Sequence, residues 1–261
     1  MIDQSDPTPT KLLLLDATNL GHRLFHSRDD RPLAERFGFA LERWRRICQP
    51  DFALAVFDPP GNDPTWRHEL WPAYKAKRND DPSKRPSASD WLAIKRECRA
   101  ARLQATWYGT AEADDMIASY TADAIRRGLN VDIVSSDKDL WQLVGPSVRV
   151  FDPGKATIAN EATVLERWGV RPDQLADLLA LAGDASDNYP GLQGIGPGRA
   201  AKLLTEYGDL ENLLANAALV PGKVAEVLRA GASQARRFRL LSGLVLDVPL
   251  LPPITSATWF R

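Results

Sequence analysis

Nine acidic residues, placed at five points along the chain, constrain its possible folds more than any other feature. Most of them follow an apolar run or open an expected helix. Carboxylates that crowd together repel one another and resist burial unless a multivalent cation balances their charge. We therefore expect a divalent-metal site of the kind that cuts phosphodiesters. The nine residues are Asp16, Asp58, Glu112, Asp114, Asp115, Asp137, Asp139, Asp184 and Asp187.

Short apolar runs alternate with amphipathic segments through the first two-thirds of the chain. The apolar runs have the length of buried strands, and the amphipathic segments have helical periodicity. This alternation predicts an α/β fold with a mostly parallel central sheet flanked by helices on both faces. The strands are expected at residues 12–15, 52–57, 131–135 and 148–151, and the helices at residues 33–48, 91–105 and 111–127.

The acidic residues lie where such a sheet binds its ligands. Asp16, Asp58 and Asp137 each fall at or just past the carboxyl end of an expected strand, the edge where open α/β sheets bind ligands. Three further acids, at 112–115, fall in the first turn of a helix that Thr110 could cap. Complementarity to the helix dipole explains one or two acids there. Complementarity to the dipole explains three acids less well and does not explain the other six acids at all. We therefore favour a single site that all nine acids share.

After about residue 170 the pattern changes to helices joined by Gly and Pro, expected at residues 174–182, 199–207, 209–217 and 223–230. The segment Gly191–Gly198 runs directly into one of them and has the form of a helix-hairpin-helix element. Its exposed N–H groups could bind a phosphate without reading a base, although such a loop can also be only a tight turn. The expected DNA contacts are Gly194, Gly196, Gly198, Arg199 and Lys202, and the carbonyls of Leu181, Ala182, Pro190, Leu192 and Ile195 could hold a monovalent cation such as K⁺.

Bulk properties place the chain among soluble globular proteins, with 261 residues and a net charge of −1. Two segments are locally basic, 66–86 with six basic and three acidic residues, and 223–239 with five and one. They suit a polyanion, although a charge run alone is more often solvated surface. Cys48 and Cys98 lack metal-ligand spacing, and no segment has the length of a signal or membrane span, so we expect a cytoplasmic, nucleoid-associated protein.

Four segments together resemble the signature blocks of bacterial and phage 5′ nucleases. They are Asp16–Arg23, Ala111–Asp115, Ser135–Leu143 and Leu181–Gly191, in family order within a similarity that runs from about residue 12 to 214. The family includes flap endonucleases, the 5′-nuclease domain of DNA polymerase I and the stand-alone exonuclease IX type. The resemblance implies a PIN-like core, and none of the family's nine carboxylates is missing.

The same resemblance implies a structure-specific phosphodiesterase, either a flap endonuclease or a 5′-3′ exonuclease. Two Mg²⁺ ions, which Mn²⁺ could replace, would generate the attacking hydroxide and stabilise the leaving oxygen. It implies branched or flapped DNA as substrate, a monomer, and any partner polymerase or ligase acting in trans.

Individual residues outside the acidic set also match family positions. Arg23 matches a phosphate-facing arginine, Lys75 would place positive charge beside the scissile phosphate, and Tyr74 could stack on a base near the cut. Arg67 and Arg78 lie in the basic segment that leads into a helical arch and are expected to contact DNA.

The expected organisation is a disordered N-terminus at 1–10, a metal-binding core at 11–169 and a helical DNA-binding region at 170–261. The arch would occupy about 67–100, and the helix-hairpin-helix about 189–205. Two other functions stay open, a PIN-like metal-dependent RNase and a non-catalytic DNA-junction binder. The glycine hairpin disfavours the first, and the complete acidic set disfavours the second because so many carboxylates repel phosphate.

Overall fold

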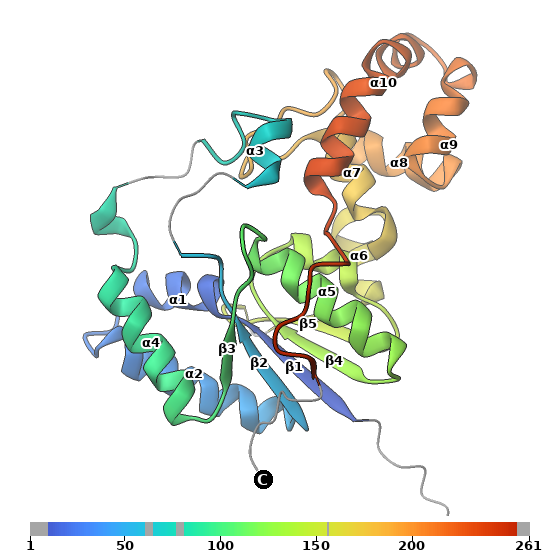
Figure 1. Cartoon of the computed structure of the whole chain (residues 1–261). Coiled ribbons are helices and arrows are strands. Elements are labelled where there is room, and N and C mark those ends of the chain that lie inside the picture. The colour runs from blue at the N-terminus through green and yellow to red at the C-terminus, as the bar shows by residue number, and fades with distance from the viewer. Residues whose placement is uncertain (1–9, 61–64, 77–80, 156, 255–261) are drawn as a thin grey trace, which may run out of the picture.

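The protein is built around a single six-stranded sheet (Figure 1). The computed structural model describes residues 10–60, 65–76, 81–155 and 157–254. The strand order is β3-β2-β1-β4-β5-β6, with β6 antiparallel to β5 and all other neighbours parallel. This confirms the predicted fold class. The strands are β1 (Lys11–Asp16), β2 (Phe52–Val56), β3 (Gln104–Thr106), β4 (Asn130–Val134), β5 (Val148–Asp152) and β6 (Thr157–Ala159).

Strand β1 shows why the apolar runs become central strands. Leu12 and Leu14 face one side of the sheet, Leu13 and Leu15 face the other, and all four side chains are fully buried. Successive strand residues point to opposite faces, so a continuous apolar run requires helices on both. One face is covered by α1 (Ala17–Phe25), α2 (Leu33–Cys48) and α4 (Ala88–Ala100), and the other by α5 (Ala113–Arg126) and α6 (Glu161–Trp168).

The helix predicted at 91–105 is wrong at its end. Helix α4 stops at Ala100, Arg102 adopts a left-handed backbone with φ 53°, and the chain then enters edge strand β3. Helix α1, the short helix α3 (Trp66–Leu70), α6 and strands β3 and β6 were not predicted. Asp16 explains the start of α1, because its side chain accepts a hydrogen bond from Asn19 N at 3.0 Å and caps the helix.

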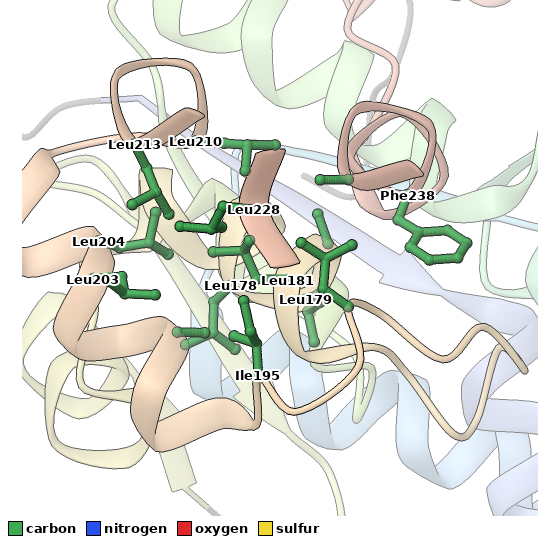
Figure 2. Close-up of a cluster of buried hydrophobic side chains, with 14 of the residues drawn as sticks. Leu178, Leu179, Leu181, Ile195, Leu203, Leu204, Leu210, Leu213, Leu228 and Phe238 are labelled. Atoms are coloured by element: carbon green, nitrogen blue, oxygen red, sulfur yellow. The ribbon is translucent and has the colours of Figure 1, made fainter. Parts of the chain in front are cut away.

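A second apolar core lies among the helices of the C-terminal part (Figure 2). In Figure 2, Leu178 and Leu181 of α7 (Leu175–Ala182) meet Ile195, Leu204 and Leu228 from the segments that follow. Helix α10 is much longer than the predicted 223–230 and packs along α7. The remaining helices are α7 (Leu175–Ala182), α8 (Pro197–Tyr207), α9 (Leu210–Ala215) and α10 (Lys223–Ser242), with 3₁₀ turns at Pro82–Lys84, Asp139–Leu143, Pro172–Gln174 and Ala217–Leu219.

After α10 the chain returns across α5 towards the sheet, as the dark red trace in Figure 1 shows. Val245 N donates to Asp115 Oδ1 at 3.0 Å, and Tyr120 Oη donates to the Pro252 carbonyl at 2.7 Å. Val248 and Ile254 are buried in the same core as α5. This segment, residues 243–254, therefore links the helical C-terminal part to the sheet.

Candidate metal centre

Two groups of carboxylates could each hold a metal ion at the carboxyl edge of the sheet. Glu112, Asp114 and Asp115 form the first group, at the start of α5. Asp139, Asp184 and Asp187 form the second, from the 3₁₀ turn after β4 and the loop after α7. Within each group, one carboxylate oxygen per residue lies within 4.8 Å of the others. Six of the nine acids, distant in sequence, thus converge as two ligand sets.

The remaining three acids surround the end of β1. Asp16 Oδ2 accepts a hydrogen bond from Ser135 Oγ at 2.8 Å, and the same Ser135 hydroxyl accepts one from Asp137 N at 3.0 Å. Asp58 Oδ1 accepts a bond from Ala113 N at 2.8 Å, which places it at the start of α5 beside the first group. The structure therefore brings all nine predicted acids to one edge of the sheet.

The second group fits a hard dication because it contains a buried carboxylate oxygen that lacks a donor. Asp139 Oδ1 has no hydrogen-bond partner among the described residues, and the nearest cation, Lys138 Nζ, is 3.5 Å away. Lys138 Nζ lies closer to Asp184 Oδ2, at 2.6 Å, while Ser186 donates two bonds to Asp184 Oδ1. Buried polar atoms are rarely left unsatisfied, and carboxylate oxygens are the ligands that Mg²⁺ and Mn²⁺ prefer.

Burial and mutual repulsion raise the pKa values of three of these carboxylates. Burial raises the pKa of Asp139 to about 7, with Asp137 adding to the effect, and burial raises the pKa of Asp16 to about 7, with Asp58 contributing. The pKa of Asp114 also lies well above its ordinary value, through burial and then repulsion from Glu112. A bound cation would reverse this balance by favouring the charged forms.

We predict that dication binding competes with protons near neutral pH. Because a ligand carboxylate must be deprotonated, and the pKa of Asp139 is about 7, affinity should be at least about tenfold weaker at pH 6 than at pH 8. Mn²⁺ titration followed by electron paramagnetic resonance measures this directly. Equal affinity at the two pH values would contradict the assigned ligand.

Arg67 holds the first group together and does not face solvent. It is 1% exposed. Its guanidinium donates to Glu112 Oε2 at 2.8 Å and to both oxygens of Asp115 at 2.7 Å, and it reaches the carbonyls of Leu241 and Gly243 at 3.0 Å. This burial contradicts the prediction that Arg67 contacts DNA. Instead, the arginine joins α3, α5 and the end of α10 around two metal-site carboxylates.

Lys75 contacts one residue of each carboxylate group. Its Nζ donates to Glu112 Oε1 at 2.7 Å, while its backbone N donates to the Asp187 carbonyl at 3.0 Å. The residue has φ 55°, a conformation that non-glycine residues rarely adopt and that often marks functional sites. Although burial raises the pKa of Glu112, attraction to Lys75 and Arg67 outweighs it and holds that pKa below its usual range.

The structure bears differently on the roles predicted for Tyr74, Arg23 and Arg78. Tyr74 is 2% exposed and its hydroxyl donates to Glu112 Oε2 at 3.1 Å, so the prediction that its ring stacks on a base is wrong. Arg23 is exposed and lies over Gly154, where an added Cβ would meet its guanidinium at 1.9 Å. Its phosphate-facing role stays a prediction. Arg78 falls outside the described residues.

The glycine hairpin has a packed side and an open side. Gly183 (φ 83°) and Gly191 (φ 67°) lie back to back, because a Cβ on Gly191 would come within 2.3 Å of Gly183 N. By contrast, Gly194, Gly196 and Gly198 are exposed, and a Cβ on any of them would meet nothing within 4 Å. The open side leads into α8 and is the side accessible to a phosphate.

Arg199 and Lys202, both exposed, extend this open side along α8. Arg199 Nη1 donates to the Gly194 carbonyl at 2.7 Å and thereby closes the hairpin. The Leu181 and Leu192 carbonyls, two of the candidate K⁺ ligands, accept backbone hydrogen bonds from Leu192 N at 2.8 Å and Ile195 N at 3.0 Å. A K⁺ ion would have to use the second lone pair of each oxygen.

We predict that Gly196→Val weakens duplex binding roughly tenfold without unfolding the protein. Gly196 has φ −86°, which valine tolerates, while its branched side chain would hold a phosphate away from the N–H groups. Gly145→Val is the matched control, because Gly145 is equally open but precedes β5 at the opposite edge of the sheet. Fluorescence anisotropy with duplex DNA gives both affinities. Equal affinity for the two variants would remove the hairpin from the interface.

Sequence reasoning missed the supporting role of three residues, Ser135, Lys138 and Arg67, and it assigned the last of them to DNA. The first two lie inside the block Ser135–Leu143, so their position beside Asp137 was a usable signal. Arg67 had no local signal, because its carboxylate partners lie 45 and 48 residues away along the chain.

Comparisons with known proteins agree with this geometry. Residues 11–169 match the family described as 5′-3′ exonuclease, N-terminal resolvase-like domain, and residues 170–259 match 5′-3′ exonuclease, C-terminal SAM fold. DNA polymerase I of Rhizobium leguminosarum is 37% identical over 92% of this chain and 25% of the relative. The chain thus spans about a quarter of that relative's length. Flap endonuclease Xni of Klebsiella pneumoniae is 36% identical over 92% of this chain and 94% of the relative.

Two solved structures share the fold. T5 5′-exonuclease, solved with bound divalent zinc, superposes with a TM-score of 0.78 at 23% identity, covering 90% of each chain. The catalytic core of Rad2 in complex with DNA gives a TM-score of 0.58 at 16% identity, covering 97% of this chain and 82% of Rad2. None of the helices among the described residues has the length and apolar character needed to cross a membrane.

Proposed function

This chain belongs to the 5′-3′ exonuclease family, and we propose that it is a structure-specific, metal-dependent 5′ nuclease that cuts branched or 5′-ended DNA. The observation that carries the proposal is the pair of carboxylate groups, with Lys75 in contact with one residue of each. Two ligand sets at one strand edge suit an in-line displacement, in which both the attacking and the leaving oxygen need stabilisation.

We propose Mg²⁺ as the resident ion of both sets, with Mn²⁺ as a substitute. Bound there, such ions would supply an ionised water as nucleophile and stabilise charge on the leaving oxygen. The first set would use Glu112, Asp114 and Asp115, and the second Asp139, Asp184 and Asp187. Asp16, Asp58 and Asp137 would act through water, because Mg²⁺ keeps several of its own waters.

The protein's own cations would then orient the phosphate and the ligands. The Lys75 ammonium, now paired with Glu112, would be available to the scissile phosphate, where negative charge accumulates. Arg67 would fix the orientation of Glu112 and Asp115 from behind, since all of its bonds lie inside the protein. Arg23 and Arg78 are proposed to contact phosphates of the single strand.

The helices between residues 170 and 242 are proposed to hold the duplex. The exposed glycines there, with Arg199 and Lys202, would bind phosphates by backbone N–H groups and charge, so that shape and not sequence is read. A K⁺ ion at the hairpin carbonyls would add to that binding. We further propose that the protein acts as a monomer on nucleoid DNA in the cytoplasm, with any polymerase or ligase in trans.

A cleavage assay tests the proposal. Flap, nicked, blunt and single-stranded DNA are compared with their RNA equivalents, with Mg²⁺, with Mn²⁺ and with chelator. We expect cleavage of flap DNA near the junction of single and double strand, only when a dication is present. Preferential cleavage of RNA, or binding without any metal-dependent cleavage, would overturn the proposal.

A further inference from the structure

Trp107 has an unusual environment for a tryptophan. It is 42% exposed, and it is the one exposed tryptophan within the described ranges. Tryptophan is enriched at contact surfaces, because its indole offers a large apolar area together with an N–H donor. Trp107 directly follows β3, and Thr106 accepts a backbone hydrogen bond from Phe57 N at 2.8 Å. Trp107 therefore lies just past the carboxyl end of β3, beside the end of β2, at the edge of the sheet that carries the metal centre.

A cation accompanies the indole. Lys95 Nζ is 4.0 Å from the Trp107 ring centroid and 5.2 Å from that of Phe57. No carboxylate of the described chain forms an ion pair with Lys95, and partial burial lowers the pKa of its ammonium. A half-buried ammonium held only by aromatic rings keeps its donors available for an anion.

The surroundings hold both side chains in place. Trp91, one turn before Lys95 on α4, packs edge-on against Phe57 and His22. A Cβ on Gly21 would come within 2.5 Å of the Trp91 ring, so α1 and α4 are in close contact there. The aromatic side chains beside Lys95 are therefore closely packed, so that Lys95 and Trp107 are already positioned before a ligand binds.

We propose that Trp107 and Lys95 form a nucleotide subsite for the single-stranded 5′ part of the substrate, with the indole stacking on a base and the ammonium contacting a phosphate. Only an unpaired base offers a free face to an indole, because bases within a duplex are already stacked. Trp107 precedes Glu112 by five residues, so the subsite lies within roughly 17 Å of the first metal ligands. This subsite rests on the proposed nuclease function and adds a determinant for single-stranded substrate.

An abasic scan tests the subsite. The DNA is a duplex with a 5′ single-stranded extension in which one abasic nucleotide is moved along the extension, and a fully paired duplex serves as reference. Affinity is measured by fluorescence anisotropy, so the readout does not depend on cleavage. We expect one abasic position to weaken wild-type binding roughly five- to hundredfold, the range for loss of one base stack.

Substitutions at Trp107 test whether the indole accounts for that loss of DNA affinity. Trp107→Ala should bind unmodified DNA as weakly as the wild type binds the DNA with that abasic position. Placing the abasic nucleotide there should not weaken the binding of Trp107→Ala any further. Trp107→Phe should retain most of the wild-type affinity for unmodified DNA. Phe39→Ala is the matched control, an exposed ring on α2 with Arg31 4.9 Å from its centroid. Lys95→Met should weaken extended substrates more than the paired duplex.

The outcomes separate the two proposals. If Trp107→Ala binds every DNA as wild type does, or loses equal affinity for the fully paired duplex, the subsite is wrong. Cleavage of flap DNA by the wild type, measured on the same samples, decides the nuclease function independently of that result.

Discussion

Asp139→Asn is expected to reduce Mg²⁺-dependent cleavage of flap DNA by more than about a hundredfold, because loss of an outer-shell partner alone commonly costs about 10–100-fold. The substitution keeps the shape of the side chain and removes the buried oxygen charge that has no donor. Single-turnover cleavage at saturating DNA measures the effect. DNA affinity should be retained, since one repulsive charge facing the phosphates is gone.

Thermal stability of the metal-free protein tests whether this variant remains folded. Because the pKa of Asp139 is raised from 3.8 to about 7, the native state binds the proton more tightly than the unfolded state does. Its contribution to stability is therefore greatest below pH 4 and falls as the pH rises towards 7. Asparagine cannot ionise, so Asp139→Asn does not lose stability in this way as the pH rises. The melting temperature of the variant at pH 8 should therefore be no lower than that of the wild type.

An exposed acid outside the two carboxylate groups completes that test. Asp173 also lies in a short 3₁₀ turn, but its side chain is exposed and paired with Arg171. Asp173→Asn should cleave as wild type does. If Asp139→Asn turned over flap DNA at the same rate as Asp173→Asn, the second metal set would be misassigned.

Arg67→Met is expected to lower the free energy of unfolding by about 3–5 kcal/mol, the usual cost of removing one partner from a buried ion pair. The methionine would leave Glu112 and Asp115 buried without their guanidinium, and the Leu241 and Gly243 carbonyls without a donor. Cleavage should fall as well, because the first ligand set loses its orientation. Urea denaturation in the presence of chelator measures the stability term separately from metal binding.

Arg236→Met is the control for this prediction. Arg236 also forms a two-pronged pair, with Glu211, but both side chains are more than half exposed. Exposed pairs of this kind contribute little, so the control should unfold close to wild type. Similar losses for both variants would mean that Arg67 contributes no more than a surface charge.

The contrast between Arg67 and the acids explains how far the sequence could predict this molecule. Parallel strands bring their carboxyl ends to one edge, so acids after apolar runs could be placed from local pattern alone. The burial of Arg67 could not be predicted, because the arginine bonds to the end of α10 and to the segment after it, more than 170 residues away along the chain. The burial of Tyr74 could not be predicted either, because its ring belongs to the apolar core of the C-terminal helices. In the same way, a left-handed residue at Arg102 ended a helix that periodicity extended to 105.

The central claim is that the two carboxylate groups hold two dications beside Lys75. Crystals soaked in Mn²⁺ and measured for anomalous scattering test it most directly. We expect two peaks, one against Glu112, Asp114 and Asp115 and one against Asp139, Asp184 and Asp187. Absence of both peaks at saturating Mn²⁺, or peaks only at other acids, would contradict the account.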